Sequence, residues 1–289
     1  MKLSVIISTY NAPEWLEKVL WGYSVQRHRD FELIIGDDGS SDETRQCIVS
    51  IRDQTGLNIK HIRQEDKGFR KCRILNKSIL AAEADYVVFS DGDCIPRDDF
   101  LTVHAREAEA GCFLSGGYQK LPMSTSMAIT KEDILAGRCF DLKWLKAHGL
   151  KKNRKNTKLT AGPKMARFLN RLTPTRCTFK GSNGSAWLKD ILMINGFDER
   201  MPWGGLDREF GVRLANAGIR ARHVRYNAVV IHLDHKRGYQ DPEQVRANKN
   251  LRRANERNGV VRTLYGISQL PKYQADRSEL QETAKDGQN

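Results

Sequence analysis

The hydrophobic positions between residues 3 and 90 follow two alternating patterns. Short runs rich in Val, Ile, Leu and Phe predict buried strands, and apolar residues spaced three or four apart predict amphipathic helices. Strands are expected at 3–8, 31–36, 57–62 and 86–90, and helices at 15–25, 41–51 and 73–83. Strands that alternate with helices over short connections indicate an α/β fold, with a mostly parallel sheet flanked by helices.

The pattern is weaker after residue 93. Further helices are expected at 100–110, 164–172 and 207–217, and further strands at 112–118 and 228–233. The polar segment from residue 241 onward is expected to be helical and to fray after Ala275. We predict one compact domain with four parts, which are residues 1–120, a partly helical insert at 121–180, residues 181–240, and a C-terminal helical tail at 241–289.

Composition excludes several classes of protein. The chain has 289 residues, 39% of them hydrophobic, and its 23 Gly and 6 Cys are ordinary frequencies. Collagen-like and disulfide-stapled chains are therefore excluded, and the scattered cysteines are expected to be reduced. No run approaches the roughly 18 apolar residues of a membrane span, and the N-terminal apolar run is too short for a signal peptide. We therefore expect a cytoplasmic protein.

The net charge of +13 is concentrated in one segment. Residues 137–180 contain 13 Lys or Arg and one acidic residue, Asp141, which leaves the rest of the chain near neutral. Such a basic insert is typical of a nucleic-acid binder, of a protein that binds anionic membranes, and of an enzyme with an acidic substrate. Charge alone does not choose among them.

Polar clusters follow three of the predicted strands. They are Thr9-Tyr10-Asn11, Asp37-Asp38 and Asp91-Gly92-Asp93. Taken alone, each of the two acidic clusters is also a common turn composition. In open parallel sheets, however, ligands bind outside the carboxyl ends of the strands. Paired carboxylates there suit Mg²⁺ or Mn²⁺, which such proteins often share with a substrate's phosphates.

These segments together resemble those of family-2 glycosyltransferases. The first half of the chain contributes Val5-Ile6-Ile7-Ser8-Thr9-Tyr10-Asn11, Asp37-Asp38-Gly39-Ser40, Lys67-Gly68-Phe69-Arg70 and Ser90-Asp91-Gly92-Asp93. The second half is similar to the acceptor region of galactosyltransferases and polypeptide N-acetylgalactosaminyltransferases, through Gly181-Ser182-Asn183, Asn195-Gly196-Phe197-Asp198-Glu199 and Trp203-Gly204-Gly205-Leu206-Asp207-Arg208-Glu209. The resemblance covers about residues 1–120 and 178–237.

The resemblance implies a Rossmann-like GT-A fold whose first part, residues 1–120, binds a nucleotide-sugar donor, commonly a UDP-sugar. The donor contacts that it implies are Thr9 and Asn11 on the nucleoside, Asp38 or Asp37 on the uracil, Lys67 and Arg70 on base or phosphate, and Asp91 on the ribose. Asp93 would bind the divalent cation, Mn²⁺ or Mg²⁺. His235, after the last predicted strand, aligns best with a second metal ligand, although a purely structural histidine is an equal alternative.

The same resemblance implies that residues 181–240 bind the acceptor and catalyse transfer. Asp207 would be the general base, and Trp203, Gly205 and Glu209 would contact the acceptor. Asp207 is also expected near the start of a helix, where a capping carboxylate is common. Leu206 stands where the related sequences carry Glu, which leaves the acceptor's identity open.

The function implied is inverting, metal-dependent transfer of a hexose or N-acetylhexosamine to a hydroxyl of a glycan or glycolipid, in bacterial cell-surface polysaccharide or lipopolysaccharide synthesis. We expect the basic insert to attract an anionic membrane, which would make the protein peripheral on the inner face. The alternatives are a nucleotidyltransferase on a related fold and a basic protein that binds nucleic acid or anionic surfaces. No nucleic-acid reader motif is present, so we expect no nucleic-acid partner.

Overall fold

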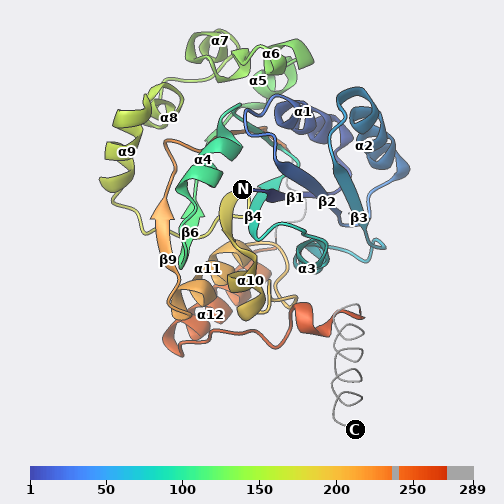
Figure 1. Cartoon of the computed structure of the whole chain (residues 1–289), viewed down its shortest axis with the longest axis vertical. Coiled ribbons are helices and arrows are strands. Elements are labelled where there is room, and N and C mark those ends of the chain that lie inside the picture. Colours follow the sequence, from blue (N-terminus) through green and yellow to red (C-terminus); the bar gives the residue numbers. More distant parts are fainter. Residues whose placement is uncertain (236–240, 272–289) are drawn as a thin grey trace.

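A computed structural model describes residues 1–235 and 241–271 of the chain. Its central sheet has seven strands in the order β3-β2-β1-β4-β8-β6-β9 (Figure 1). β8 runs antiparallel to β4 and β6, whereas the other neighbouring pairs are parallel. The strands are β1 (Leu3–Thr9), β2 (Phe31–Asp37), β3 (Ile59–Arg63), β4 (Tyr86–Asp91), β6 (Cys112–Ser115), β8 (Asn183–Trp187) and β9 (Arg220–His223). The predicted mostly parallel α/β fold is confirmed.

The register of the central strands brings the polar clusters level with one another. Thr9 pairs with Asp37 on one side of β1, and Ser8 pairs with Asp91 on the other. β1 is buried along its whole length, which explains its unbroken apolar run. The three strand ends therefore meet at one edge of the sheet.

Helices cover both faces of the sheet (Figure 1). Alternate residues of β1 belong to different cores, since Val5 and Ile7 pack on one face and Ile6 packs on the other. The first core contains residues of α1 (Pro13–Ser24), α2 (Asp42–Thr55) and α4 (Phe100–Glu107), and the second contains residues of α3 (Lys71–Leu80), α10 (Leu188–Met193) and α11 (Leu206–Asn216).

A second, three-stranded sheet has the order β5-β10-β7. It consists of β5 (Cys94–Pro96), β7 (Gly117–Lys120) and β10 (Val229–His232). The strand predicted over 112–118 was wrong in extent, because the chain leaves the first sheet after Ser115 and enters the second at Gly117. Asn183 holds this crossing, since its amide donates to the carbonyl of Gly117 at 2.8 Å. Pairing of β10 with β5 sets His232 opposite Cys94, directly beside Asp93.

The insert at 121–180 is a chain of short helices, and its first part packs onto the body of the protein. It contains α5 (Met123–Ala128), α6 (Lys131–Leu135), η1 (Arg138–Phe140), α7 (Leu142–Ala147), η2 (Arg154–Asn156), α8 (Thr157–Thr160) and α9 (Pro163–Arg171). Cys139, Leu145 and Leu150 are buried in the core that also contains α1. This part of the insert is therefore structural, whereas α9 lies at the edge of the molecule in Figure 1.

The C-terminal part begins with α12 (Pro242–Arg257), which packs against α11, and ends with η3 (Ile267–Gln269). The expected fraying after Ala275 lies outside the described residues. Among residues 1–235 and 241–271, no helix combines the length and the apolar character that a membrane span requires.

Candidate active site

A cleft of about 1170 Å³ opens where the carboxyl ends of β1, β2 and β4 face the start of α11. Nine residues implicated by the sequence line it, namely Thr9, Asn11, Asp38, Asp91, Asp93, Trp203, Gly205, Asp207 and His235. They come from segments as far apart in the sequence as Thr9 and His235, and the fold brings them to one surface. The site that the sequence divides into donor and acceptor halves is therefore one continuous cleft.

Asp38 forms the buried end of the cleft next to β1. Its carboxylate accepts hydrogen bonds from the amide of Gln64 at 2.6 Å and from the backbone N–H of Arg70 at 2.8 Å. Burial raises the pKa of Asp38 in spite of these two bonds. Asn11 also lines the cleft and has a φ of 45°, a left-handed conformation that Asn adopts more readily than most residues. Its side-chain oxygen accepts the N–H of Ser41 at 2.8 Å, which fixes the turn.

Lys71 lies at the centre of the acidic groups. Its ammonium is 2.6 Å from Asp91, which also accepts the hydroxyl of Ser8 at 2.8 Å. Burial alone would lower the pKa of Lys71, but the carboxylates of Asp91, Asp93 and Asp207 raise it above its usual value. The lysine is therefore a fixed cation among three carboxylates. The role of Lys71 was not predicted, since nothing in the sequence distinguishes this residue from the neighbouring Lys67 and Arg70.

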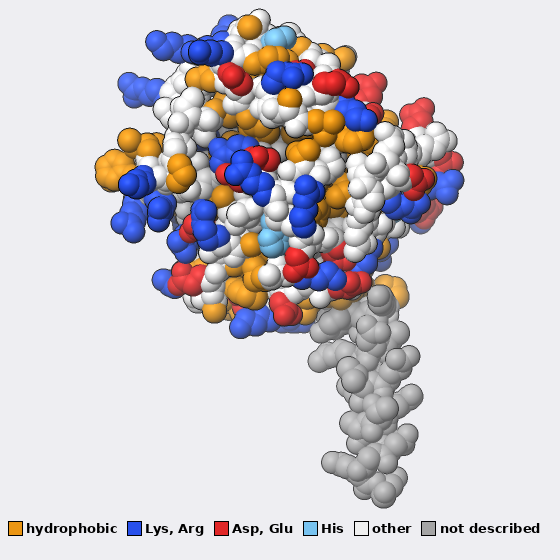
Figure 2. Space-filling view, turned by 45° about the horizontal axis from the view of Figure 1, so that its top comes forward, with side chains coloured by type: hydrophobic (Ala, Val, Ile, Leu, Met, Phe, Trp, Pro, Cys, Tyr) orange, Lys and Arg blue, Asp and Glu red, His pale blue; other side chains and the backbone are white. Residues whose placement is uncertain are grey.

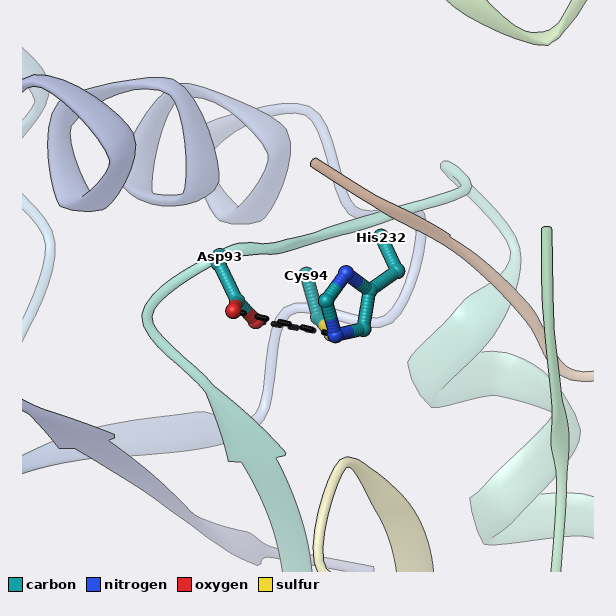
Figure 3. A group of neighbouring side chains, drawn as sticks. All are labelled: Asp93, Cys94 and His232. Carbon is teal, nitrogen blue, oxygen red and sulfur yellow. Dashed lines mark hydrogen bonds and ion pairs between the residues drawn. The ribbon is translucent and has the colours of Figure 1, made fainter. Parts of the chain in front are cut away.

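Asp93, Cys94 and His232 place an oxygen, a sulfur and a nitrogen within 4.8 Å of one another (Figure 3). His235 adds a second imidazole, with Nε2 at 3.1 Å from the Asp93 carboxylate, and His232 Nε2 lies at 3.7 Å. Burial would raise the pKa of Asp93, but the two histidines and Cys94 hold it well below its usual range. His232 Nδ1 lies 2.7 Å from the carbonyl oxygen of Leu233. Because that oxygen can only accept a hydrogen bond, Nδ1 is the donor, which leaves Nε2, on the side of Asp93, as the nitrogen that can bind a cation.

This donor set fits a divalent cation. Carboxylate oxygen and neutral imidazole are ligands that Mn²⁺ accepts well, and a fixed histidine tautomer is typical of metal-binding histidines. The Cys94 thiol instead donates to the Asp93 carboxylate at 3.2 Å. The residues that would hold the cation are therefore Asp93, His232 and His235, one more histidine than the sequence indicated.

Asp207 is placed by the start of α11. Gly205 precedes the helix with a φ of 81°, in the left-handed region that favours glycine, and turns the chain so that Asp207 faces the cleft. One carboxylate oxygen accepts the N–H of Arg208 at 2.8 Å, and the other lies 3.4 Å from the N–H of Gly181. Burial raises the pKa of Asp207 despite these contacts. A carboxylate with a raised pKa is a better proton acceptor.

Comparison with known families agrees with this geometry. The profile of glycosyl transferase family 2 matches residues 4–168, more than half of the chain. The chain belongs to glycosyl transferase family 2. The family resemblance seen in the sequence is confirmed, and the nucleotidyltransferase alternative is set aside.

Curated relatives of this glycosyltransferase include the chondroitin synthase of Escherichia coli, which is 30% identical over 77% of this chain and 33% of its own length. The validoxylamine A glucosyltransferase of Streptomyces hygroscopicus subsp. jinggangensis is 30% identical over 75% of this chain and 52% of its own length. The chain thus spans a third to a half of these two relatives.

Solved structures share the fold of this glycosyltransferase. TarS 1–349 of S. aureus, in complex with UDP-GlcNAc, superposes with a TM-score of 0.61 at 17% identity, over 90% of this chain and 70% of that one. The mannosyltransferase PcManGT of Pyrobaculum calidifontis, in complex with GDP-Man and Mn²⁺, gives a TM-score of 0.56 at 19% identity, over 88% and 61%. At these identities the likeness shows the fold alone.

Four residues that the sequence implicated lie outside the cleft of this glycosyltransferase. Glu209 is fully buried, and its carboxylate pairs with Arg213 at 2.6 Å. Contrary to the expectation from the sequence, it therefore does not face the cleft and cannot contact an acceptor there. Asp37 binds His61 at 2.9 Å and the N–H of Ser40 at 2.8 Å, which leaves Asp38 as the carboxylate that faces the cleft.

Lys67 and Arg70 are the other two. Lys67 pairs with the exposed Glu65 at 2.8 Å, and the Arg70 guanidinium donates to the carbonyl of Glu65. Neither side chain lines the cleft, although Gly68 and Phe69 between them do. The loop of residues 67–70 therefore reaches the cleft through its middle rather than through its two cations.

Proposed function

We propose that this enzyme transfers a hexose or N-acetylhexosamine from a UDP-sugar to a hydroxyl group of a glycan or lipid-linked acceptor, with inversion at the anomeric carbon. The observation that carries the proposal is the convergence of Asp38, Asp91, Asp93 and Asp207 in one cleft, with Lys71 among them. The UDP-GlcNAc complex of the TarS neighbour supports the choice of donor, and the likeness to a chondroitin synthase supports the choice of acceptor class.

The donor would lie along the strand ends. Asp38 is suited to accept the N–H of a uracil, with Thr9 and Asn11 against the nucleoside. Asp91, held by Ser8 and Lys71, would accept ribose hydroxyls. Asp93, His232 and His235 would hold Mn²⁺ or Mg²⁺. When bound there, the cation supplies positive charge close to a leaving diphosphate.

Asp207 would act as the general base in a single displacement. Its carboxylate would accept the proton of the acceptor hydroxyl while that oxygen forms the bond to the anomeric carbon and UDP departs. Gly181 N–H and Arg208 N–H orient the carboxylate. Trp203 and Gly205 line the cleft beside it and would contact the acceptor sugar. The buried Leu206 occupies the position of the related Glu and makes this wall apolar.

The direct test is UDP release from a panel of UDP-sugars, with and without Mn²⁺. We expect release from one sugar, lost without the metal and in Asp93→Ala. Asp207→Asn should lower the rate of transfer about 10²–10⁴-fold, the usual contribution of a general base, and leave UDP affinity unchanged. Asp53→Asn, on the exposed surface of α2, is the matched control. Absence of both release and UDP binding in the wild type would refute the proposal.

We also propose that the basic insert binds the anionic inner face of a bacterial membrane, where cell-surface polysaccharide or lipopolysaccharide is made. α9 supports this. Met165, Phe168 and Leu172 are 54%, 56% and 60% exposed and share one face of the helix. Lys164, Arg167 and Arg171 lie among them. Apolar and basic side chains gather together at the left edge of Figure 2, on the side where Figure 1 shows α9.

Such a combination is typical of helices that lie in a membrane interface. We expect sedimentation with vesicles rich in phosphatidylglycerol, weaker at high salt, and none with pure phosphatidylcholine. Joint replacement of Met165, Phe168 and Leu172 by Ser should abolish binding to the anionic vesicles. Met127→Ser removes a methionine of similar exposure on α5 and should leave binding intact. Equal retention of both variants would exclude α9 as the contact.

A further inference from the structure

Two lysines of the basic insert point into the protein rather than into solvent. Lys158 of α8 is 5% exposed and donates to the carbonyl of Tyr118 at 2.8 Å. Lys180, just before β8, donates to the carbonyl of Gly116 at 2.9 Å. Both ammonium groups lie near the Tyr118 ring, at 5.7 and 5.6 Å from its centre. Two cations of the insert, 22 residues apart in the sequence, therefore meet at one aromatic side chain.

A third cation, Arg225, lies near enough for its charge to act on both lysines. Its guanidinium donates to the hydroxyl of Thr175 at 3.1 Å, but its Nε is buried and has no hydrogen-bond partner. In the described part of the chain, none of the three cations forms an ion pair with a carboxylate. Burial, with the positive charge of Arg225, lowers the pKa of Lys158 to about 7 and that of Lys180 to about 8. Burial and mutual repulsion thus disfavour the charged forms of both lysines, and an anion bound beside them would stabilise those charged forms.

Lys180 connects this group of cations to the part of the cleft that contains Asp207, and Lys158 and Arg225 lie behind it, outside the cleft lining. Tyr118 and Lys180 line the cleft, and Lys180 is followed by Gly181, whose N–H faces the Asp207 carboxylate. The carboxylate that acts on Lys180 is that of Asp207, whereas Lys71 takes its charge partners from Asp91 and Asp93 as well. Lys180 is therefore associated with the proposed base, and Lys71 with the donor carboxylates.

We propose that Lys158, Lys180 and Arg225 form a subsite for an anionic group of the acceptor, a carboxylate or a phosphate, next to the hydroxyl that Asp207 deprotonates. This inference rests on the proposed function. It names the acceptor class as an acidic glycan or a sugar phosphate. Charge-assisted hydrogen bonds to such a group are stronger than those between neutral groups, and they would satisfy the cations that the fold leaves uncompensated.

The test compares matched acceptors on the UDP-saturated protein, with affinity measured by calorimetry. One pair is an oligosaccharide ending in a uronic acid and its carboxyl-reduced form. The other pair is an oligomer of glycerol phosphate and a glycerol oligomer that lacks phosphate. We expect one anionic member to bind at least about 10-fold more tightly than its neutral counterpart. The pair that shows the difference identifies carboxylate or phosphate as the source of the anion.

Variants then assign the preference to the two lysines. Lys180→Met and Lys158→Met should each remove most of it, Lys180→Arg should retain it, and the exposed Lys152→Met should not change it. UDP affinity should stay at the wild-type value in all four. Lys180→Met alone remains decisive if Lys158→Met folds poorly, which thermal unfolding would reveal.

The subsite is refuted if neither anionic acceptor binds more tightly than its neutral partner. It is also refuted if Lys180→Met weakens UDP binding as much as acceptor binding, because the cations would then belong to the donor. Failure of the proposed function looks different, since the wild type would bind no UDP at all.

Discussion

At the scale of single residues, the position of a carboxylate in its element decides whether it reaches the cleft. Asp37 ends β2 and Asp38 follows it, and consecutive residues of an extended chain point to opposite sides. The Asp37 carboxylate therefore contacts the His61 ring away from the cleft, whereas Asp38 lines the cleft. Glu209 follows Asp207 by two helical positions, about 200° around α11, so it faces the core.

Lys71 provides a residue-scale prediction about the pH dependence of transfer. Its charge lowers the pKa of Asp207, while burial raises it. Removing the lysine in Lys71→Met should raise the pKa of Asp207 further. A general base works when deprotonated, so activity is lost as pH falls through its pKa. We therefore expect the acidic limb of the pH profile of kcat to move to higher pH in Lys71→Met. The value of kcat/KM should fall by at most about 10-fold.

The measurement is a full pH–rate profile of UDP release for the wild type and Lys71→Met. Lys189→Met, an exposed lysine of α10, serves as the control and should keep the wild-type profile. An acidic limb that stays in place in Lys71→Met would show that the lysine does not act on the base.

At the scale of elements, the strands found from the sequence are those with strong apolar runs. β1, β2 and β4 are buried along nearly their whole length, so their composition alone marks them. The three-residue β5 was not predicted, and neither were β8 and β9. β8 has the sequence NGSAW, and β9 has RARH with three exposed residues, so neither has a hydrophobic run. Their pairing depends on β4 and β6 beside them, which no local pattern records.

α11 carries a prediction at this scale. Arg213 and Glu209 form a fully buried pair, and the same guanidinium donates to the carbonyls of Ile194 and Gly196 at 2.6 and 2.7 Å. Arg213→Met would leave the Glu209 charge buried without its partner. Breaking such a pair typically costs about 3–5 kcal/mol. We expect a loss of that size in the free energy of unfolding in urea.

Arg220→Met removes an arginine whose pair with Glu109 is exposed, and it should change stability little. Because Glu209 does not line the cleft, the folded fraction of Arg213→Met should keep the wild-type KM for the acceptor. A raised KM for the acceptor with unchanged stability in Arg213→Met would instead indicate that Glu209 contacts the acceptor.

At the scale of the whole molecule, the insert is one segment by its charge but three parts by its packing. The sequence shows one basic segment at 137–180 around a single acidic residue. In the structure, Cys139, Leu145 and Leu150 at the beginning of this segment are part of the hydrophobic core. Lys158 and Lys180 donate hydrogen bonds to backbone carbonyls inside the protein, whereas α9 lies at the surface. Sequence spacing could not separate these roles, because each depends on contacts with residues far away in the chain.

The division predicts that the insert cannot be removed as a unit. Cys139, Leu145 and Leu150 are at most 7% exposed and pack in the core shared with α1. Burying a side chain of this size contributes about 1.5–3 kcal/mol for the larger two, which is a large part of the 5–15 kcal/mol that stabilises a typical domain. Replacing residues 137–150 by a short Gly-Ser linker should therefore abolish cooperative thermal unfolding and expose apolar surface to a dye such as ANS. The variant in which Met165, Phe168 and Leu172 are Ser should unfold at the wild-type temperature. If the shortened chain unfolded cooperatively at that same temperature, residues 137–150 would be a dispensable surface segment.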